Sequence, residues 1–189
     1  MRRAGPGSYR NRALTFARVL LLFRFLLCLL RARFRSRVGA LEESVTRFTA
    51  LPHDCDLNFH LNAGRFVSFM DIARVELIVR LRLLGKMLKR GWRPVGAGCI
   101  VRYRRSILPF ERFEIRTRVV GWDDRWFYIE HVVEKNGTFC AIGHMRTVIR
   151  GPNGSVPPRE VLALMKNADL TSPELPSVVR EWRDLEDRR

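Results

Sequence analysis

The chain has 189 residues, and 47% of them are hydrophobic, which suits one domain with a sizeable core and some additional segments. The formal net charge of +16 is uneven, because residues 1–41 hold ten arginines and no acidic residue. The rest of the chain is only moderately basic. The charge therefore does not indicate a nucleic-acid-binding domain, and we expect no nucleic-acid partner.

The cysteines form no Cys-x-x-Cys pair and have no ligand spacing with the four histidines. This excludes the common zinc motifs and a disulfide framework, so we expect no metal site and a reducing compartment. Their positions are Cys28, Cys55, Cys99 and Cys140.

Residues 13–34 are rich in Leu and Phe, but arginines interrupt them too often for a plain membrane-spanning helix. On a helical projection Arg24, Cys28, Arg31 and Arg35 form a narrow polar stripe. We expect residues 13–35 to lie on an anionic membrane surface, with the arginine heads toward lipid phosphates, and we expect the protein to be cytoplasmic and membrane-associated. A helix docked on its own domain or on a partner, a spanning helix and an organelle transit peptide are the alternatives.

A polar loop, residues 54–62, follows a strand predicted at residues 44–50 and precedes a long apolar-periodic segment. Asp56, Asn58 and His60 alternate, so an extended or turning backbone could point all three in one direction. Asn62 is a good N-cap for a helix that starts at residue 63 or 64, and a helix start offers free N–H groups. This combination can polarise a carbonyl and deliver water to it.

The predicted helix covers residues 64–84, and we expect its Glu76 on the solvent-exposed face rather than in a site. Strand-like segments follow at residues 94–105, 111–122, 126–135 and 138–150, with an Asn136-Gly137 hairpin turn between the last two. A short helix is predicted from Pro157. The organisation is an N-terminal helix in residues 1–41, an α+β domain in residues 42–152, and an extension in residues 153–189.

Four motifs make residues 42–182 resemble hotdog-fold acyl-CoA thioesterases. Asp54-Cys55-Asp56 resembles the 4-hydroxybenzoyl-CoA thioesterase type, and Asp-x-Asn-x-His at residues 56–60 resembles plant acyl-carrier-protein thioesterases. Residues 116–125 (Arg-Thr-Arg-Val-Val-Gly-Trp-Asp-Asp-Arg) and 172–176 (Ser-Pro-Glu-Leu-Pro) resemble a narrower group, the sixth member of the animal thioesterase superfamily and its relatives.

The resemblance implies a hotdog fold, in which an antiparallel sheet of five or six strands wraps around the central helix. It also implies at least a homodimer, with sites shared between subunits. The implied substrate is a fatty or aromatic acyl thioester of coenzyme A or an acyl-carrier protein. No separate cofactor is expected, because coenzyme A is part of the substrate.

The resemblance also assigns roles to the polar loop. Asp56 is the expected base or nucleophile, Asn58 orients water or the carbonyl, and His60 is a second acid/base or carbonyl partner. The backbone N–H groups of Ala63 and Gly64 are expected to stabilise the oxyanion. The expected contacts for the phosphates of coenzyme A, which arginine binds in a bidentate manner, are Arg102, Arg104 and Arg105.

A second function stays open from the sequence: a non-catalytic acyl-binding hotdog protein that its N-terminal helix tethers to a membrane. The presence of the full set of Asp56, Asn58 and His60 favours the enzyme.

Overall fold

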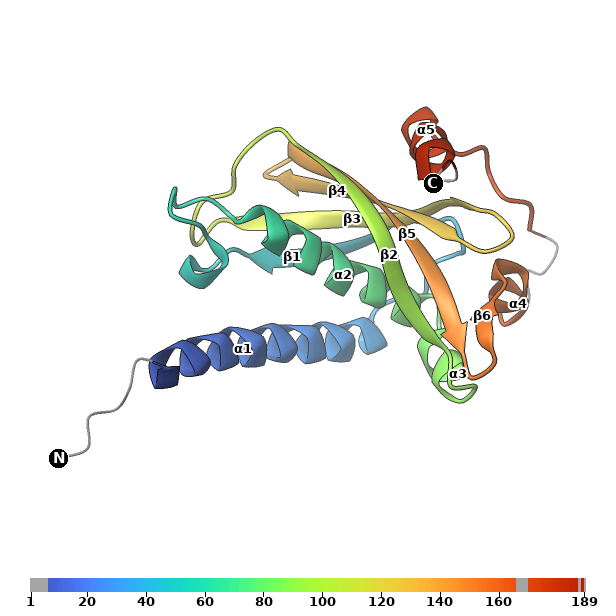
Figure 1. Cartoon of the computed structure of the whole chain (residues 1–189), viewed down its shortest axis with the longest axis horizontal. Helices are drawn as coiled ribbons and strands as arrows, with labels where there is room; N and C mark the ends of the chain where they lie inside the picture. The colour runs from blue at the N-terminus through green and yellow to red at the C-terminus, as the bar shows by residue number, and fades with distance from the viewer. Residues whose placement is uncertain (1–6, 166–169, 187, 189) are drawn as a thin grey trace.

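A six-stranded antiparallel sheet curls around helix α2 (Ala63–Arg80) in the computed structural model of the chain (Figure 1). Residues 7–165, 170–186 and 188 are described, and the side chains of the first helix are described from Leu20 onward. The spatial order of the main strands is β1-β3-β4-β5-β2, and β6 pairs with β5. Their bounds are β1 Ser44–Thr49, β2 Arg93–Tyr103, β3 Arg112–Trp122, β4 Phe127–Lys135, β5 Thr138–Gly151 and β6 Gly154–Val156.

The hairpins follow the predicted turns. Asn136 and Gly137 both adopt positive φ angles, 50° and 73°, and join β4 to β5 with Lys135 opposite Thr138. Positive φ at both central residues is what a tight hairpin with right-handed strand twist needs. The one strand before α2 and the four main strands after it are those predicted from the sequence.

Helix α2 begins at its predicted cap and packs its apolar face on the sheet. The Asn62 side chain accepts a hydrogen bond from the Gly64 N–H. The Phe69 ring then packs between Phe48 of β1 and Phe113 of β3, at centroid distances of 4.8 and 5.3 Å. This aromatic cluster fixes the helix start relative to the edge of the sheet where β1 lies.

The end of the helix differs from the prediction. Helix α2 stops at Arg80 rather than continuing to residue 84, and a short helix, α3 (Leu84–Leu88), follows. Arg82 separates the two with a φ of 59°, and its guanidinium donates to the backbone oxygens of Arg33 and Arg35. Contacts with a distant segment therefore favour the break over local helix propensity.

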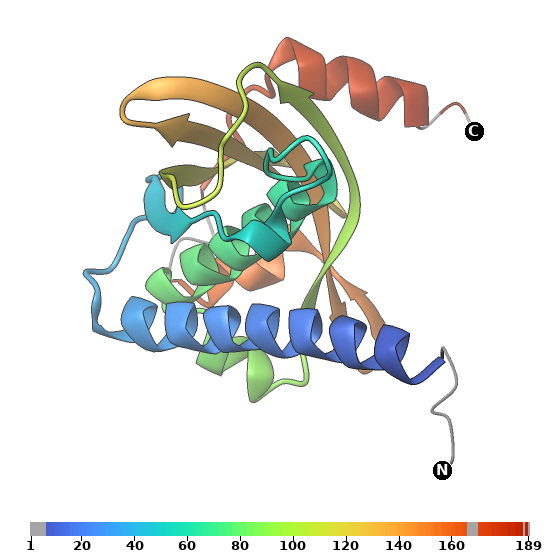
Figure 2. The ribbon, with the colours of Figure 1, turned by 90° about the vertical axis from the view of Figure 1, so that its left-hand side faces the viewer.

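The C-terminal segment adds β6, α4 (Pro158–Ala163) and α5 (Ser177–Glu186), so the sheet continues beyond residue 152. Helix α5 packs on the outer face of the sheet, which faces away from α2 (Figure 2). The Arg146 guanidinium lies 4.8 Å from the Trp126 ring and 5.7 Å from the Trp182 ring of α5. These cation–π contacts fix α5 to the sheet.

Helix α1 (Gly7–Phe34) lies alongside α2 at the open side of the curled sheet (Figures 1 and 2). Its polar stripe faces the domain, where Arg24 binds Asp54 at 2.7 Å and Arg35 binds Glu76 at 2.5 Å. The predicted direction of these two arginines, toward lipid, is wrong, because buried carboxylates of the same chain attract them. Docking on its own domain, one of the alternatives, is what α1 does.

The opposite face of α1 carries large apolar side chains that are more than half exposed: Leu22, Phe23, Leu26, Leu30 and Phe34. Among the described residues no helix is both long and apolar enough to span a bilayer.

Candidate active site

Asp56 lies at the base of a tight loop. Its backbone N–H donates to the His60 oxygen at 2.9 Å, and Cys55 pairs with Leu61 across the loop. One carboxylate oxygen of Asp56 accepts hydrogen bonds from the Asn58 N–H at 2.9 Å and from the His60 N–H at 3.4 Å. The backbone thus holds the Asp56 side chain in one orientation, while the residue itself stays exposed to solvent.

A cavity of about 300 Å³ brings several of the predicted site residues together. Asp56, His60 and Ala63 line it from the loop and the start of α2, and Arg104 and Arg105 line it from the segment after β2. The two segments are joined by a hydrogen bond from the Leu61 N–H to the Ile107 oxygen at 2.8 Å.

Three predicted residues do not line this cavity. Asn58 lies at the exposed tip of the loop, between Leu57 and Phe59, and Phe59 has a φ of 55°. Arg102 is exposed, and the alternation of β2 turns its side chain to the face opposite Tyr103. The Gly64 N–H donates to the Asn62 side chain at 2.9 Å, and this bond is the helix cap.

The helix start nevertheless offers one backbone donor. Among the described residues none accepts a hydrogen bond from the Ala63 N–H, which is the first N–H of α2. The N-terminal end of a helix carries a partial positive charge, so a group with developing negative charge is stabilised there.

Tyr103 is a wall residue of the cavity that the sequence analysis did not select. Its hydroxyl donates to the Ala63 backbone oxygen at 3.1 Å, and its ring meets the Phe66 ring edge-on at a centroid distance of 5.2 Å. Burial raises the pKa of Tyr103, so the hydroxyl remains protonated. The end of β2 is thereby attached to the start of α2. The sequence offered one signal for Tyr103: it stands between Arg102 and Arg104, which were both selected, and its side chain lies on the strand face opposite to that of Arg102.

Asp54 is the second residue that the sequence analysis missed. Its side chain is only 1% exposed and receives Arg24 at 2.7 Å and Arg65 at 3.7 Å. It also accepts from the Leu51 N–H at 3.0 Å, while its backbone oxygen accepts from the Asn62 N–H at 2.9 Å. Asp54 therefore holds both ends of the loop and connects it to α1.

Cys55 fits the structural role that two neighbouring aspartates suggest. Burial and the charges of Asp54 and Asp56 raise the pKa of its thiol, which disfavours a thiolate nucleophile.

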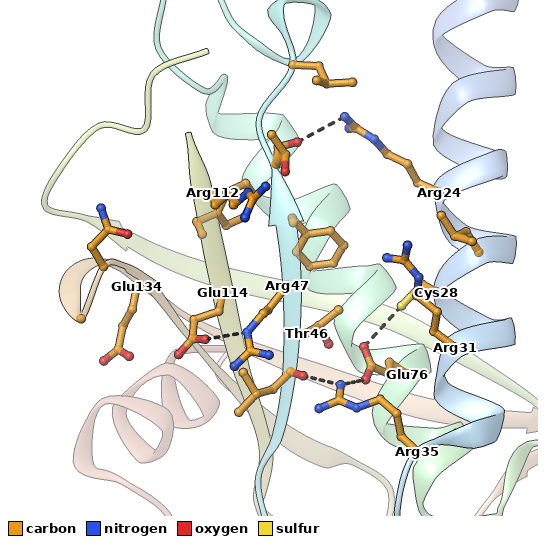
Figure 3. A pocket seen from close by; sticks show the side chains of 18 residues that line it. Arg24, Cys28, Arg31, Arg35, Thr46, Arg47, Glu76, Arg112, Glu114 and Glu134 are labelled. Atoms are coloured by element: carbon orange, nitrogen blue, oxygen red, sulfur yellow. Dashed lines mark hydrogen bonds and ion pairs between the residues drawn. The ribbon is translucent and has the colours of Figure 1, made fainter. Parts of the chain in front are cut away.

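Glu76 contradicts the expectation of a solvent-exposed helix position. Its side chain is 3% exposed, and it lies between Arg35 at 2.5 Å and the Cys28 thiol at 3.3 Å (Figure 3). The helix face that periodicity assigned to solvent is covered by α1. Burial, and then the Glu76 charge, raise the pKa of the Cys28 thiol far above its ordinary range.

The two strand histidines are buried away from the cavity. His131 lies 3.0 Å from the Thr117 hydroxyl through its Nδ1, and His144 lies 3.2 Å from Glu130. Across the described part of the chain, His, Cys, Asp and Glu side chains form no group that could hold a metal ion.

Comparison with known proteins gives the family. Residues 50–182 match the family described as the thioesterase-like superfamily. The chain is 37% identical to Protein THEM6 of Xenopus laevis over 159 residues, which cover 82% of this chain and 75% of that protein. It is 23% identical to a probable thioesterase, YBR096W, of Saccharomyces cerevisiae, covering 60% of this chain and 50% of that protein.

A solved structure confirms the fold. The DHNA-CoA thioesterase of Staphylococcus aureus superimposes with a TM-score of 0.61 at 16% identity, covering 76% of this chain and 95% of that one. The predicted hotdog fold and the predicted likeness to the sixth member of the animal thioesterase superfamily are both confirmed.

Proposed function

This chain belongs to the thioesterase-like superfamily and is a thioester hydrolase of that family, and we propose that it cleaves a fatty or aromatic acyl thioester of coenzyme A at a site centred on Asp56. The observation that carries this proposal is one cavity lined by Asp56, His60 and Ala63 together with Arg104 and Arg105. A carboxylate and a helix start lie there beside two cations suited to phosphate, which are the features a coenzyme A thioester requires.

The proposed chemistry uses these groups in order. As a base, Asp56 takes a proton from water while the water oxygen bonds to the thioester carbonyl carbon. The carbonyl oxygen becomes an oxyanion, which the Ala63 N–H and the positive end of α2 stabilise. Collapse of this intermediate breaks the carbon–sulfur bond and expels the coenzyme A thiolate, which receives the proton. As a nucleophile, the Asp56 carboxylate would instead attack the carbonyl carbon and expel the coenzyme A thiolate, which leaves a mixed anhydride; water then hydrolyses the anhydride to the free acid and regenerates the Asp56 carboxylate.

We also propose that the active unit is at least a homodimer. In the single chain Leu57 and Phe59, beside the site, are 97% and 73% exposed, which is unusual for apolar side chains next to a catalytic group. Strand β2 is an edge of the sheet, with an exposed Gly96-Ala97 segment that leaves its backbone accessible. A second copy that covers these features would complete the site.

Membrane association is the third part of the proposal. The outer face of α1 exposes apolar side chains from Leu22 to Phe34, and exposed Arg33 and Arg37 lie at and just beyond its C-terminal end. An apolar face with basic residues beside it suits the interface of an anionic bilayer. We propose that this face, rather than the arginine stripe, enters the lipid.

The hydrolytic role is tested with Asp56→Asn, which keeps the volume and removes the charge. Turnover on a panel of acyl-CoAs of different chain length should fall by about 10²-fold or more, since a positioned acid–base group contributes ~10²–10⁴-fold. Asp124→Asn, in the exposed β3–β4 turn, is the matched control and should leave turnover unchanged. Turnover of Asp56→Asn within about threefold of wild type would exclude this role.

The same panel separates the enzyme from the second candidate function, a non-catalytic acyl-binding protein tethered to a membrane. The exposed apolar face of α1 supports tethering under either function. Binding of acyl-CoA without turnover, by wild-type protein on every chain length, would favour the second candidate.

Membrane association is tested by co-sedimentation with phosphatidylserine-containing vesicles. The double variant Phe23→Ser/Leu26→Ser should lose most binding, and Leu185→Ser, an equally exposed apolar residue of α5, should bind like wild type. Binding should also weaken as salt rises, because screening shortens the reach of the arginine charges. Equal sedimentation of both variants would refute the assignment of this face.

A further inference from the structure

A groove of about 910 Å³ runs between α1 and the edge strand β1 (Figure 3). Its volume falls within the ~300–1,000 Å³ that small-molecule sites occupy. Leu27, Cys28 and Arg31 of α1 line one wall, Thr46 and Phe48 of β1 line the other, and β3 extends the rim. The groove shares no lining residue with the cavity at Asp56. It is therefore a separate site.

The groove has an excess of positive charge, because five arginines and three glutamates line it. Arg24 and Arg35 are committed to Asp54 and Glu76. Within the described part of the chain, Arg31 and Arg112 have no acidic partner. Two cations thus remain available to an anionic ligand.

A buried hydroxyl points to the same ligand chemistry. Thr46 is only 3% exposed, and its Oγ1 has no hydrogen-bond partner among the residues that the structure describes. A buried polar group without a partner is costly, and Thr46 faces the α1 side of β1 (Figure 3). A ligand oxygen in the groove would supply the missing partner.

Hydrocarbon side chains complete the lining. Leu27, Val45, Phe48, Leu51 and Phe113 contribute apolar surface beside the charged groups. The combination of a narrow cationic edge and an apolar wall matches an amphiphile better than a small inorganic anion, which needs no hydrocarbon contact.

We propose that this groove binds an acyl chain that carries an anionic head group, with the head at Arg31 and Thr46 and the chain on Leu27, Phe48 and Leu51. The site goes beyond thioester hydrolysis, because α1 and β1 precede residue 50, where the family match begins. The groove forms where helix α1 lies against β1 of the hotdog sheet.

The test uses full-length protein and palmitate that carries a photoreactive diazirine. Cross-linked peptides should come from residues 24–35 and 45–51 rather than from the loop at residues 54–66. Arg31→Gln should weaken palmitate binding by about five- to tenfold, the range for one charge-assisted hydrogen bond at a partly exposed site. Arg33→Gln, on the same helix but outside the groove lining, is the matched control and should bind palmitate like wild type.

Two further arms make the result decisive. Lysophosphatidate is compared with palmitate, because either a phosphate or a carboxylate head could bind Arg31 and Thr46. The lipid that binds more tightly identifies the head group that the groove prefers. Asp56→Asn should bind palmitate unchanged, which separates this site from the hydrolytic one. Binding of neither lipid, equal binding of uncharged hexadecanol, or an Arg31→Gln affinity within twofold of wild type would overturn the proposal.

Discussion

Replacing Arg35 with methionine should destabilise the protein, because it leaves a buried carboxylate without its cation. Arg35 donates from Nη1 to Glu76 at 2.5 Å and to the Val45 backbone oxygen at 2.6 Å. Methionine keeps most of the aliphatic length and removes the guanidinium. Glu76 would then retain only the Cys28 thiol as a polar partner among the described side chains.

The burial of the two partners sets the magnitude. Removing one partner of a buried ion pair costs ~3–5 kcal/mol, since the remaining charge stays desolvated. Arg35 is 39% exposed while Glu76 is 3% exposed, so solvent already screens the cation side of this pair. We therefore expect Arg35→Met to lower the free energy of unfolding by about 2–3 kcal/mol.

The assay is equilibrium urea unfolding followed by tryptophan fluorescence. Arg33→Met, an exposed position in the last turn of α1 two residues before Arg35, controls for the change in net charge and should alter stability by less than ~0.5 kcal/mol. The double variant Arg35→Met/Glu76→Gln should regain at least about half of the loss, because the uncompensated charge is gone. A loss below ~0.5 kcal/mol for Arg35→Met, or a double variant less stable than the single one, would refute the reasoning.

Two other residues give predictions of a different kind. Burial, followed by the Arg74 charge, lowers the pKa of His131 to about 3, so between pH 6.5 and 3 the unfolded chain binds a proton that the folded chain does not. His131 should therefore lower the free energy of unfolding by about 1.4 kcal/mol per pH unit below pH 6.5. In urea titrations from pH 8 to 4, His131→Gln should remove this contribution, which corresponds to one proton, from the pH dependence of stability. An unchanged pH dependence would contradict the prediction. Tyr103→Phe removes the hydrogen bond to the Ala63 oxygen and should lower kcat/KM by about three- to tenfold with little change in Tm, whereas unchanged kinetics would mean that this bond does not position the helix start.

The sheet was predictable because its signals are local. Alternation marks the strands predicted at residues 44–50, 111–122 and 126–135, and the Asn136-Gly137 turn has the φ angles that its residue types favour. The end of α2 was not predictable, because Arg82 leaves the helix to bind backbone oxygens of Arg33 and Arg35, almost fifty residues earlier. Propensity carries no information on such a partner.

The candidate site also has one part that the sequence predicts and another that it does not. Asp56, His60 and the Asn62 cap belong to one short loop, so their proximity follows from the sequence. Tyr103 joins them only because the segment after β2 folds back onto that loop, and no spacing rule reports this. From the sequence, Asp56 was assigned a catalytic role and Asp54 none, and the structure adds that Asp54 is buried among cations while Asp56 lies at the cavity.

Helix α1 connects these observations. A stripe of Arg24, Cys28, Arg31 and Arg35 along a segment rich in Leu and Phe allows two orientations, with the polar face toward lipid phosphates or toward a charged protein surface. The choice depends on Asp54 and Glu76, which are buried carboxylates of the hotdog domain. Among the described residues of that domain, Asp54 has only His53 at 3.3 Å and Arg65 at 3.7 Å as basic neighbours, both farther away than Arg24 at 2.7 Å. Glu76 is paired with Arg35. Once the arginines turn inward to them, the apolar face must turn outward, so the electrostatics of the domain determine the surface that α1 offers. The composition change at residue 42 therefore marks a boundary in charge but not in contacts: the same helix that exposes an apolar face also holds, through Arg24 and Asp54, the loop that carries Asp56.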